Sequence, residues 1–357
     1  MHTNTLLGRL FGVTAVVGSL IVGVGPLPAL AGSTDQPLTR LSGTDAITTA
    51  VAINQNQFPD GSADHVVIAT IMDYADALTA TVFAARKSAP MYPTTPLGLR
   101  DSVKNDIARV LKVDSGDKDV FVIGGRTALP DIIETQLKAL RSDIDVERIE
   151  APDRAATAAA IARKMDTIVG QGPDNAFVLN GWNYPDAGAA GAIGGNKKIS
   201  ATNFPILLTR SLTLPAPTLQ YLQDNAATLD NVYVVGGPLG VSDAVFNQIK
   251  AIVPGTIRLA GFNRLSTAIA VDRQFQPAPD KVCVVRGYDF RDLLVGGVHA
   301  ALNDCPLVLV HPLLPPNPDV ASYLTANAAT IKGGFVYGGT LSVPDNVKTA
   351  IEDLYMM

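Results

Sequence analysis

The feature of this sequence that most constrains its fold is an internal repeat. Three segments, at residues 40–50, 148–158 and 258–268, align without a gap, and each opens on an arginine. Their starts are 108 and 110 residues apart. A period of this length is typical of a small domain rather than of one turn of a solenoid. The sequence therefore predicts three tandem domains of similar fold.

The same landmarks follow in each copy. An apolar strand leads to an aromatic-x-Asp turn (74–76, 184–186, 290–292), then to a strand opened by proline (90, 205, 306) and to a strand that ends in Gly-Gly (124–125, 236–237, 338–339). Short apolar strands that alternate with helix-length segments predict βαβ units and parallel sheets covered on both faces. We also expect Asp45, Asp153 and Asn263 to cap the helices that follow them.

These motifs resemble the bacterial cell-wall-binding repeat type 2. The likeness rests on the arginine-opened segments, the aromatic-x-Asp turns, the Pro-Ile-Leu-Leu strand and the Gly-Gly ends, and it extends from Arg40 almost to the end of the chain. It implies three Toprim-like, Rossmann-related α/β domains with small parallel sheets, packed with pseudo-threefold symmetry. It sets the repeats at 40–147, 148–257 and 258–357, and it implies non-covalent attachment to anionic cell-wall glycopolymers.

The N-terminal segment predicts export. Arg9 precedes an apolar run, 10–24, and Ala29-Leu30-Ala31 gives the small-x-small pattern of a signal-peptidase site. The run is shorter than the roughly 20 residues that span a bilayer and contains three glycines, which favours a cleaved signal peptide over an uncleaved anchor. We therefore expect a signal peptide at 1–31, a linker at 32–39 and no transmembrane anchor after cleavage, with the protein at the cell wall or cell surface.

Composition and motifs argue against several function classes. The net charge of −5 and the lack of a basic stripe disfavour nucleic-acid binding. The sequence has no Walker loop, Gly-x-Ser-x-Gly elbow or HExxH pair, so we predict no catalytic residue, no metal and no cofactor. The alternatives are an amidase-like wall enzyme and a structural surface-layer protein, and a surface protein could be a partner.

Candidate binding residues follow from the repeat. Arginines at the helix starts could contact anions, the aspartates of the turns could contact polymer, and the proline-opened strand is a candidate through the family resemblance alone. These residues are Arg154, Arg264, Asp76, Asp186, Asp292, Pro205, Ile206, Leu207 and Leu208. Their structural alternatives are, respectively, inter-domain salt bridges, helix caps and a core strand.

The copies are unequal at these positions. Copy 1 has Ala46 in place of the helix-start arginine, and its proline strand contains a second proline, Pro93, which removes a ladder donor. Cys283 and Cys305 both lie in copy 3. They predict either one disulfide, stabilising by about 3 kcal/mol, or two core thiols.

Overall fold

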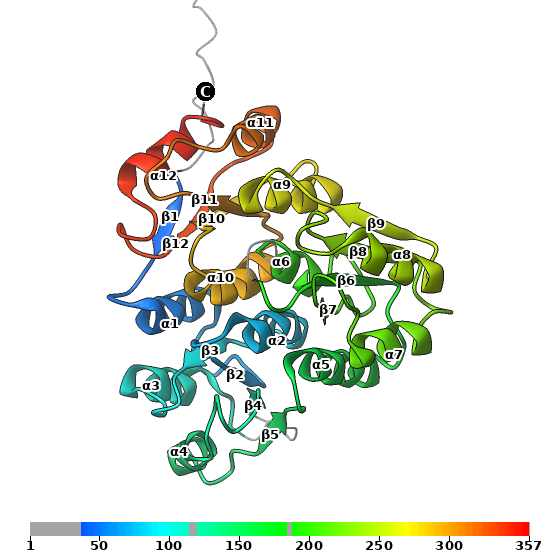
Figure 1. Ribbon diagram of the computed structural model, residues 1–357. Coiled ribbons are helices and arrows are strands. Elements are labelled where there is room, and N and C mark those ends of the chain that lie inside the picture. Colours follow the sequence, from blue (N-terminus) through cyan, green and yellow to red (C-terminus); the bar gives the residue numbers. More distant parts are fainter. Residues whose placement is uncertain (1–36, 114–119, 184–187, 357) are drawn as a thin grey trace, which may run out of the picture. The chain divides into compact units, whose positions relative to one another are not determined.

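The computed structural model describes residues 37–113, 120–183 and 188–356. The predicted signal peptide and Asp186 lie outside these residues. The described residues form one compact unit (Figure 1). Among the described residues, no helix combines the length and the apolar character needed to cross a bilayer.

Three parallel sheets, each of four strands, form the framework. The strand orders are β3-β2-β4-β5, β7-β6-β8-β9 and β11-β10-β12-β1. The strands are β1 (Thr39–Leu41), β2 (Val66–Thr70), β3 (Met91–Thr94), β4 (Val120–Ile123), β5 (Val146–Ile149), β6 (Asn175–Asn180), β7 (Ile206–Thr209), β8 (Asn231–Val235), β9 (Thr256–Leu259), β10 (Val282–Arg286), β11 (Leu307–Val310) and β12 (Gly334–Tyr337). The predicted α/β class with one small parallel sheet per repeat is confirmed.

Each sheet takes its fourth strand from a neighbouring sequence copy. The opening strands of copies 2 and 3, β5 and β9, join the sheets of copies 1 and 2, and β1 of copy 1 completes the sheet of copy 3. The sheets are thus offset from the sequence repeats by one strand. The consequence is a closed cycle, in which every copy is hydrogen-bonded along a strand to the next.

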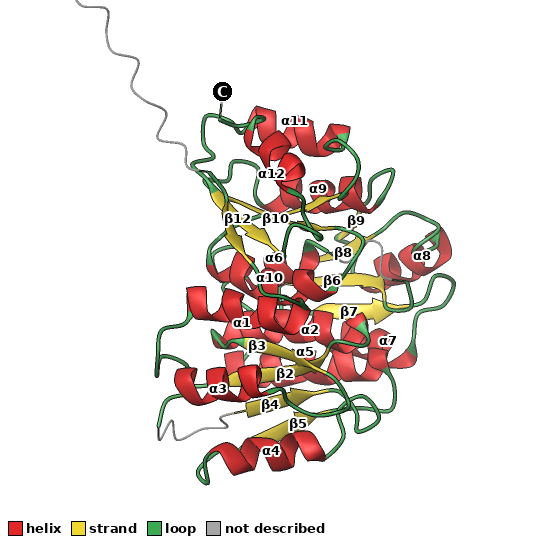
Figure 2. Cartoon of the chain, turned by 90° about the vertical axis from the view of Figure 1, so that its left-hand side faces the viewer, coloured by secondary structure: helices red, strands yellow, loops and turns green. Residues whose placement is uncertain are grey.

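Helices lie on both sides of the strands (Figure 2). They are α1 (Ala46–Gln57), α2 (Tyr74–Lys87), α3 (Asp101–Val110), α4 (Ile132–Leu140), α5 (Arg154–Val169), α6 (Ala190–Gly195), α7 (Ala216–Asp224), α8 (Asp243–Ile252), α9 (Arg264–Phe275), α10 (Arg291–Leu302), α11 (Pro318–Ala326) and α12 (Asp345–Glu352). The predicted caps are confirmed: the side chains of Asp45, Asp153 and Asn263 accept hydrogen bonds from first-turn amides.

The equivalent helices α2, α6 and α10 each pack against the other two. At their meeting point the copies hold Thr81, Gly191 and Gly297, and only the threonine has a side chain. A Cβ at either glycine would lie 3.0 Å from the Thr81 methyl group, and the Thr81 hydroxyl donates to the Leu294 carbonyl. The centre of this pseudo-threefold contact therefore has room for one side chain, so the three copies cannot all carry one there.

The apolar core is likewise divided between a part shared by the three copies and a part that belongs to each copy. One cluster of buried residues draws on all three copies, and three smaller clusters each serve one sheet and its outer helices. Pro93 is tolerated because β3 is an edge strand, paired only with β2. The six residues of α6 are all buried, as expected for a close-packed glycine-rich helix.

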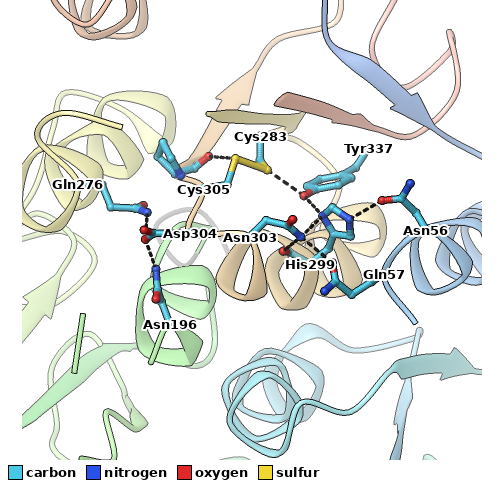
Figure 3. The surroundings of a disulfide bond; sticks show 11 residues. Asn56, Gln57, Asn196, Gln276, Cys283, His299, Asn303, Asp304, Cys305 and Tyr337 are labelled. Carbon is cyan, nitrogen blue, oxygen red and sulfur yellow. Dashed lines mark hydrogen bonds between the residues drawn. A yellow bond between two sulfur atoms is a disulfide. The ribbon is translucent and has the colours of Figure 1, made fainter. Parts of the chain in front are cut away.

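Cys283 and Cys305 form a disulfide, with their Cα atoms 5.8 Å apart (Figure 3). It joins β10 to the residues just before β11, and these two strands are neighbours in the sheet. The Tyr337 hydroxyl donates to the Cys283 sulfur over 2.9 Å. Of the two alternatives, the structure therefore has the bridged form.

Candidate functional site

Two equivalent clefts lie where the strands end and two copies meet. Cleft 1–2, of about 310 Å³, is formed by the carboxyl ends of β2 and β4 together with the start of α5. Cleft 3–1, of about 420 Å³, is formed by the ends of β10 and β12 together with the start of α1. Crevices at the carboxyl edge of parallel strands are the usual ligand sites of α/β folds. Both clefts exist only because adjacent copies share a sheet edge.

Asp76 lies in cleft 1–2, in the first turn of α2. Its Oδ1 atom is buried without a hydrogen-bond partner among the described residues. Burial raises the pKa of Asp76 to about 6, the Asp73 carboxylate adds to the rise, and Arg154 opposes it. Gly124, at φ +121°, leaves the space that Asp76 needs, since a Cβ there would lie 3.0 Å from Asp76 Oδ2.

Asp292 occupies the equivalent place in cleft 3–1. Ser342 donates its hydroxyl to Asp292 Oδ2 over 3.0 Å. Burial raises the pKa of Asp292, although this hydrogen bond works in the opposite direction. Each cleft therefore holds one buried carboxyl group that can donate as well as accept a hydrogen bond when it is protonated.

Neither aspartate is a helix cap, so that structural alternative is wrong for both. The cap of α2 is Asp73, three residues earlier, which accepts from the Ala75 amide. In copy 3, α10 has no side-chain cap, and Asp289 instead accepts from the Arg291 amide and guanidinium. The short Asp73 side chain reaches the first free amides, whereas Asp76 already lies within the helix.

Arg154 links two copies. As the first residue of α5 it donates to Asp73 Oδ2 over 2.7 Å and to the Gly181 carbonyl over 2.6 Å. Its guanidinium also lies 5.3 Å from the centre of the Trp182 ring. Arg154 therefore forms a salt bridge between two copies, which is the structural alternative to anion binding, and it does so inside cleft 1–2.

Arg264 repeats part of this arrangement at the start of α9. It donates to the Gly287 carbonyl over 3.2 Å and stacks over Tyr288, 4.4 Å from the ring centre. In copy 1 the equivalent residue is Ala46, which lines cleft 3–1. That cleft is the larger of the two described, and no helix-start arginine crosses it.

Arg286 is the cleft residue that sequence reasoning missed. It ends β10 in cleft 3–1, where the equivalent residues of copies 1 and 2 are Thr70 and Asn180. Its Nε atom is buried without a hydrogen-bond partner among the residues described, and it forms no ion pair with them. The available signal was a charged residue at the end of an otherwise apolar strand, but it occurs in one copy only and so forms no part of the repeated motifs.

The repeat-opening arginines have structural roles. Each donates Nη1 to the carbonyl of the first glycine of a Gly-Gly pair in the preceding sheet: Arg40 to Gly338, Arg148 to Gly124 and Arg258 to Gly236, over 2.7–2.8 Å. Each also pairs with a carboxylate of that sheet's last helix. These arginines stabilise the attachment of β1, β5 and β9 to the sheets of the neighbouring copies rather than contact a ligand.

The proline-opened strand is buried. Ile206, Leu207 and Leu208 are at most 2 % exposed, and the Pro205 carbonyl accepts from the Phe177 amide. These side chains build the core of the copy 2 sheet, so any influence on polymer binding must be indirect. Within the described ranges, no group of three or more His, Cys, Asp or Glu side chains could hold a metal ion.

Comparison with known families identifies the class. Residues 40–134, 148–246 and 258–348 each match cell wall binding domain 2, so the chain belongs to this family and contains three of its domains. The family places these repeats at the bacterial cell wall.

Individual relatives are larger. The chain is 27 % identical over 277 residues to N-acetylmuramoyl-L-alanine amidase LytC of Bacillus subtilis (78 % of this chain, 51 % of the relative). It is 25 % identical over 319 residues to the amidase enhancer of the same organism (89 % and 40 %). The chain thus spans about half or less of the length of these curated relatives.

Solved structures share the fold. Cwp8 from Clostridium difficile superposes with a TM-score of 0.78 at 23 % identity, covering 90 % of this chain and 52 % of Cwp8. Cwp6 from the same organism gives 0.75 at 24 % identity, covering 89 % and 48 %.

Proposed function

We propose that the protein is an exported, non-catalytic wall-binding protein whose three repeats attach it non-covalently to an anionic wall glycopolymer. The observation that supports this best is the recurrence of a polar cleft between adjacent copies, on a chain whose repeats belong to a wall-binding family. Several weak sites on one rigid body add as avidity, which suits a polymer with repeating units.

The two clefts suit different parts of such a polymer. In cleft 1–2, Asp73, Asp76 and Asp153 outnumber Arg154, so this cleft favours neutral hydroxyl groups. Cleft 3–1 also holds three aspartates, Asp45, Asp289 and Asp292, but it has two arginines, Arg286 and Arg291. The charge of Arg286 acts on Asp289 and Asp292, yet Arg286 forms no ion pair within 4 Å among the described residues, so it can bind a phosphate or carboxylate of the polymer. We propose Arg286 as the main anion contact, and Arg154 and Arg264 as residues that also shape the sites.

Binding to purified wall sacculi tests the proposal. Wild-type protein should be retained, retention should fall as salt rises, and removal of the secondary polymers should abolish it. Arg286→Gln should weaken retention several-fold. Arg273→Gln, which removes one exposed cation on α9 away from both clefts, is the matched control and should bind like wild type.

The same experiment distinguishes the alternatives. Undiminished retention on stripped sacculi would overturn the polymer assignment. Release of soluble wall fragments would favour an amidase-like enzyme. Self-association without any wall material would favour a surface-layer protein.

A further inference from the structure

A separate cavity of about 150 Å³ lies at the first junction, which we define as the contact between α2 of copy 1 and α5 of copy 2. Its walls are apolar: Phe83 comes from α2, and Met165, Ile168 and Val169 come from α5. None of its lining residues belongs to cleft 1–2 or cleft 3–1. The cavity is therefore independent of the proposed polymer sites.

Three cations complete this apolar cavity: Arg86, Lys87 and Lys197. The residues that line it include no aspartate or glutamate. Burial lowers the pKa of Lys197, and the neighbouring Arg86 lowers it further. Three cations beside an apolar wall repel one another, and an anion would relieve this repulsion.

Arg86 supplies the most specific feature. Its Nε atom donates to the Gly194 carbonyl over 3.0 Å, and Nη1 donates to the Ser200 carbonyl over 2.9 Å. The remaining Nη2 atom is buried, with no hydrogen-bond partner among the described residues. Burial lowers the pKa of Arg86 to about 10, while the charge of Asp174 works in the opposite direction, so the group stays charged at neutral pH. A buried, charged donor without a partner is costly unless a ligand satisfies it.

The second junction, between α6 of copy 2 and α9 of copy 3, closes the equivalent space. Phe275 stands where copy 2 has Met165, and its ring packs 4.8 Å from Tyr233 and 5.5 Å from Phe204. Asn196, the counterpart of Arg86, donates to Asp304 Oδ1 over 2.6 Å. The fold therefore does not require a cavity or a group of cations at this place.

The third junction, between copies 3 and 1, is also closed, by polar contacts (Figure 3). Asn303, the counterpart of Lys87, donates to Gln57 Oε1 over 2.6 Å. His299, the counterpart of Phe83, binds Asn56 through Nε2 and Tyr337 through Nδ1. The open, cationic form is thus particular to the first junction among the described residues.

We propose that the first-junction cavity binds a free small organic anion, with one phosphate or carboxylate head and an apolar body about the size of a benzene ring. Arg86 and Lys197 contact the head, and Phe83 and Met165 contact the body. An engineered apolar cavity of this volume holds benzene, which sets the size of the body. None of the lining residues belongs to either cleft, so this site is separate from the proposed polymer sites.

Calorimetric titration of the full protein with phenyl phosphate tests this site. Phenyl phosphate should bind at least tenfold more tightly than inorganic phosphate or phenol, because only it matches both halves of the cavity. Met165→Phe, which copies the closed second junction, should weaken binding at least tenfold. Lys197→Ala should do the same, whereas Lys250→Ala, which removes an exposed cation on α8, should leave binding unchanged.

Two results would overturn the assignment: equal affinity for phenyl phosphate and inorganic phosphate, or wild-type affinity in the Lys197→Ala protein. If Met165→Phe fails to fold, Lys197→Ala still decides the question, because its side chain is exposed and its one hydrogen bond is to the Ser88 hydroxyl.

Discussion

Copies 2 and 3 fill one pair of equivalent core positions with different chemistry. In copy 2, Phe177 and Phe204 stack with ring centres 4.4 Å apart and planes 10° from parallel. In copy 3 the same positions hold Cys283 and Cys305, joined by the disulfide. The strand registers establish the equivalence, since β6 pairs with β7 as β10 pairs with β11.

The difference shows how neighbouring copies share a core. The ring of Phe275, which comes from copy 3, packs against both phenylalanines. The core of copy 2 is therefore completed by a residue from across the second junction. The smaller disulfide is covered within copy 3 itself by Tyr337. The same backbone thus accommodates either a cluster of aromatic rings that includes one from the neighbouring copy, or a disulfide within a single copy.

The largest expected effect is on the aromatic side of this comparison. Phe204→Ala removes a fully buried ring that contacts three other rings, and it should lower the free energy of unfolding by about 4 kcal/mol. Urea unfolding measures the change. A loss below about 1 kcal/mol would mean that the junction relaxes to fill the space, and that the stack is not a core element.

Removing the disulfide should cost somewhat less. The bond closes a loop with a sequence separation of 22, and the double change Cys283→Ala/Cys305→Ala should lower the free energy of unfolding by about 3 kcal/mol. Because the chain has only these two cysteines, a reductant should destabilise wild type and leave the double variant unchanged. An unchanged midpoint in reduced wild type would contradict the role assigned to the bond.

Asp272 provides a comparison between copies 3 and 1. It is fully buried in α9, and neither carboxyl oxygen has a side-chain hydrogen-bond partner among the described residues. Burial raises the pKa of Asp272 to about 8, although the backbone amide of Leu307 opposes the rise. In copy 1 the equivalent residue is Asn54, whose amide donates to the Met91 carbonyl over 2.9 Å. The buried position that Asp272 and Asn54 share therefore favours an uncharged side chain.

The sign of the pH effect follows from that raised pKa. The folded state holds a proton that the unfolded state releases near its ordinary pKa of about 4, so stability should fall as pH rises from about 4 to 8. Asp272→Asn should remove most of this slope and raise the free energy of unfolding at pH 8, with little effect at pH 4. Asn54→Asp should introduce the same slope in copy 1, and a pH-independent gain in Asp272→Asn would contradict the titration.

The smallest effect concerns Arg154. Its partly exposed pair with Asp73, together with the bond to the Gly181 carbonyl, should contribute about 1 kcal/mol, so Arg154→Ala should lower the thermal midpoint by a few degrees. Arg163→Ala removes an exposed pair within copy 2 and should change the midpoint less. If Arg154→Ala instead lost wall binding at an unchanged midpoint, Arg154 would be a polymer contact rather than an inter-copy link.

Local sequence signals predicted what depends on local geometry. Asp45, Asp153 and Asn263 cap their helices because a short side-chain oxygen reaches first-turn amides wherever the helix lies. The roles of Asp76 and Arg286 could not be predicted in this way. Asp76 has its space because Gly124, some fifty residues further along the chain, carries no side chain, and Arg286 lies in a cleft that two copies build.

The sequence by itself determined the threefold repeat and the βαβ pattern, because each is encoded by residues within one copy, whereas it left open whether the two cysteines are bridged. Only the tertiary structure decided that β1 completes the sheet of copy 3, that the clefts lie between copies, and that Thr81 faces two glycines. These features depend on which surfaces meet when the chain closes. The repeat gives the three domains the same fold. The junctions between them differ because the side chains that meet there differ in volume and charge.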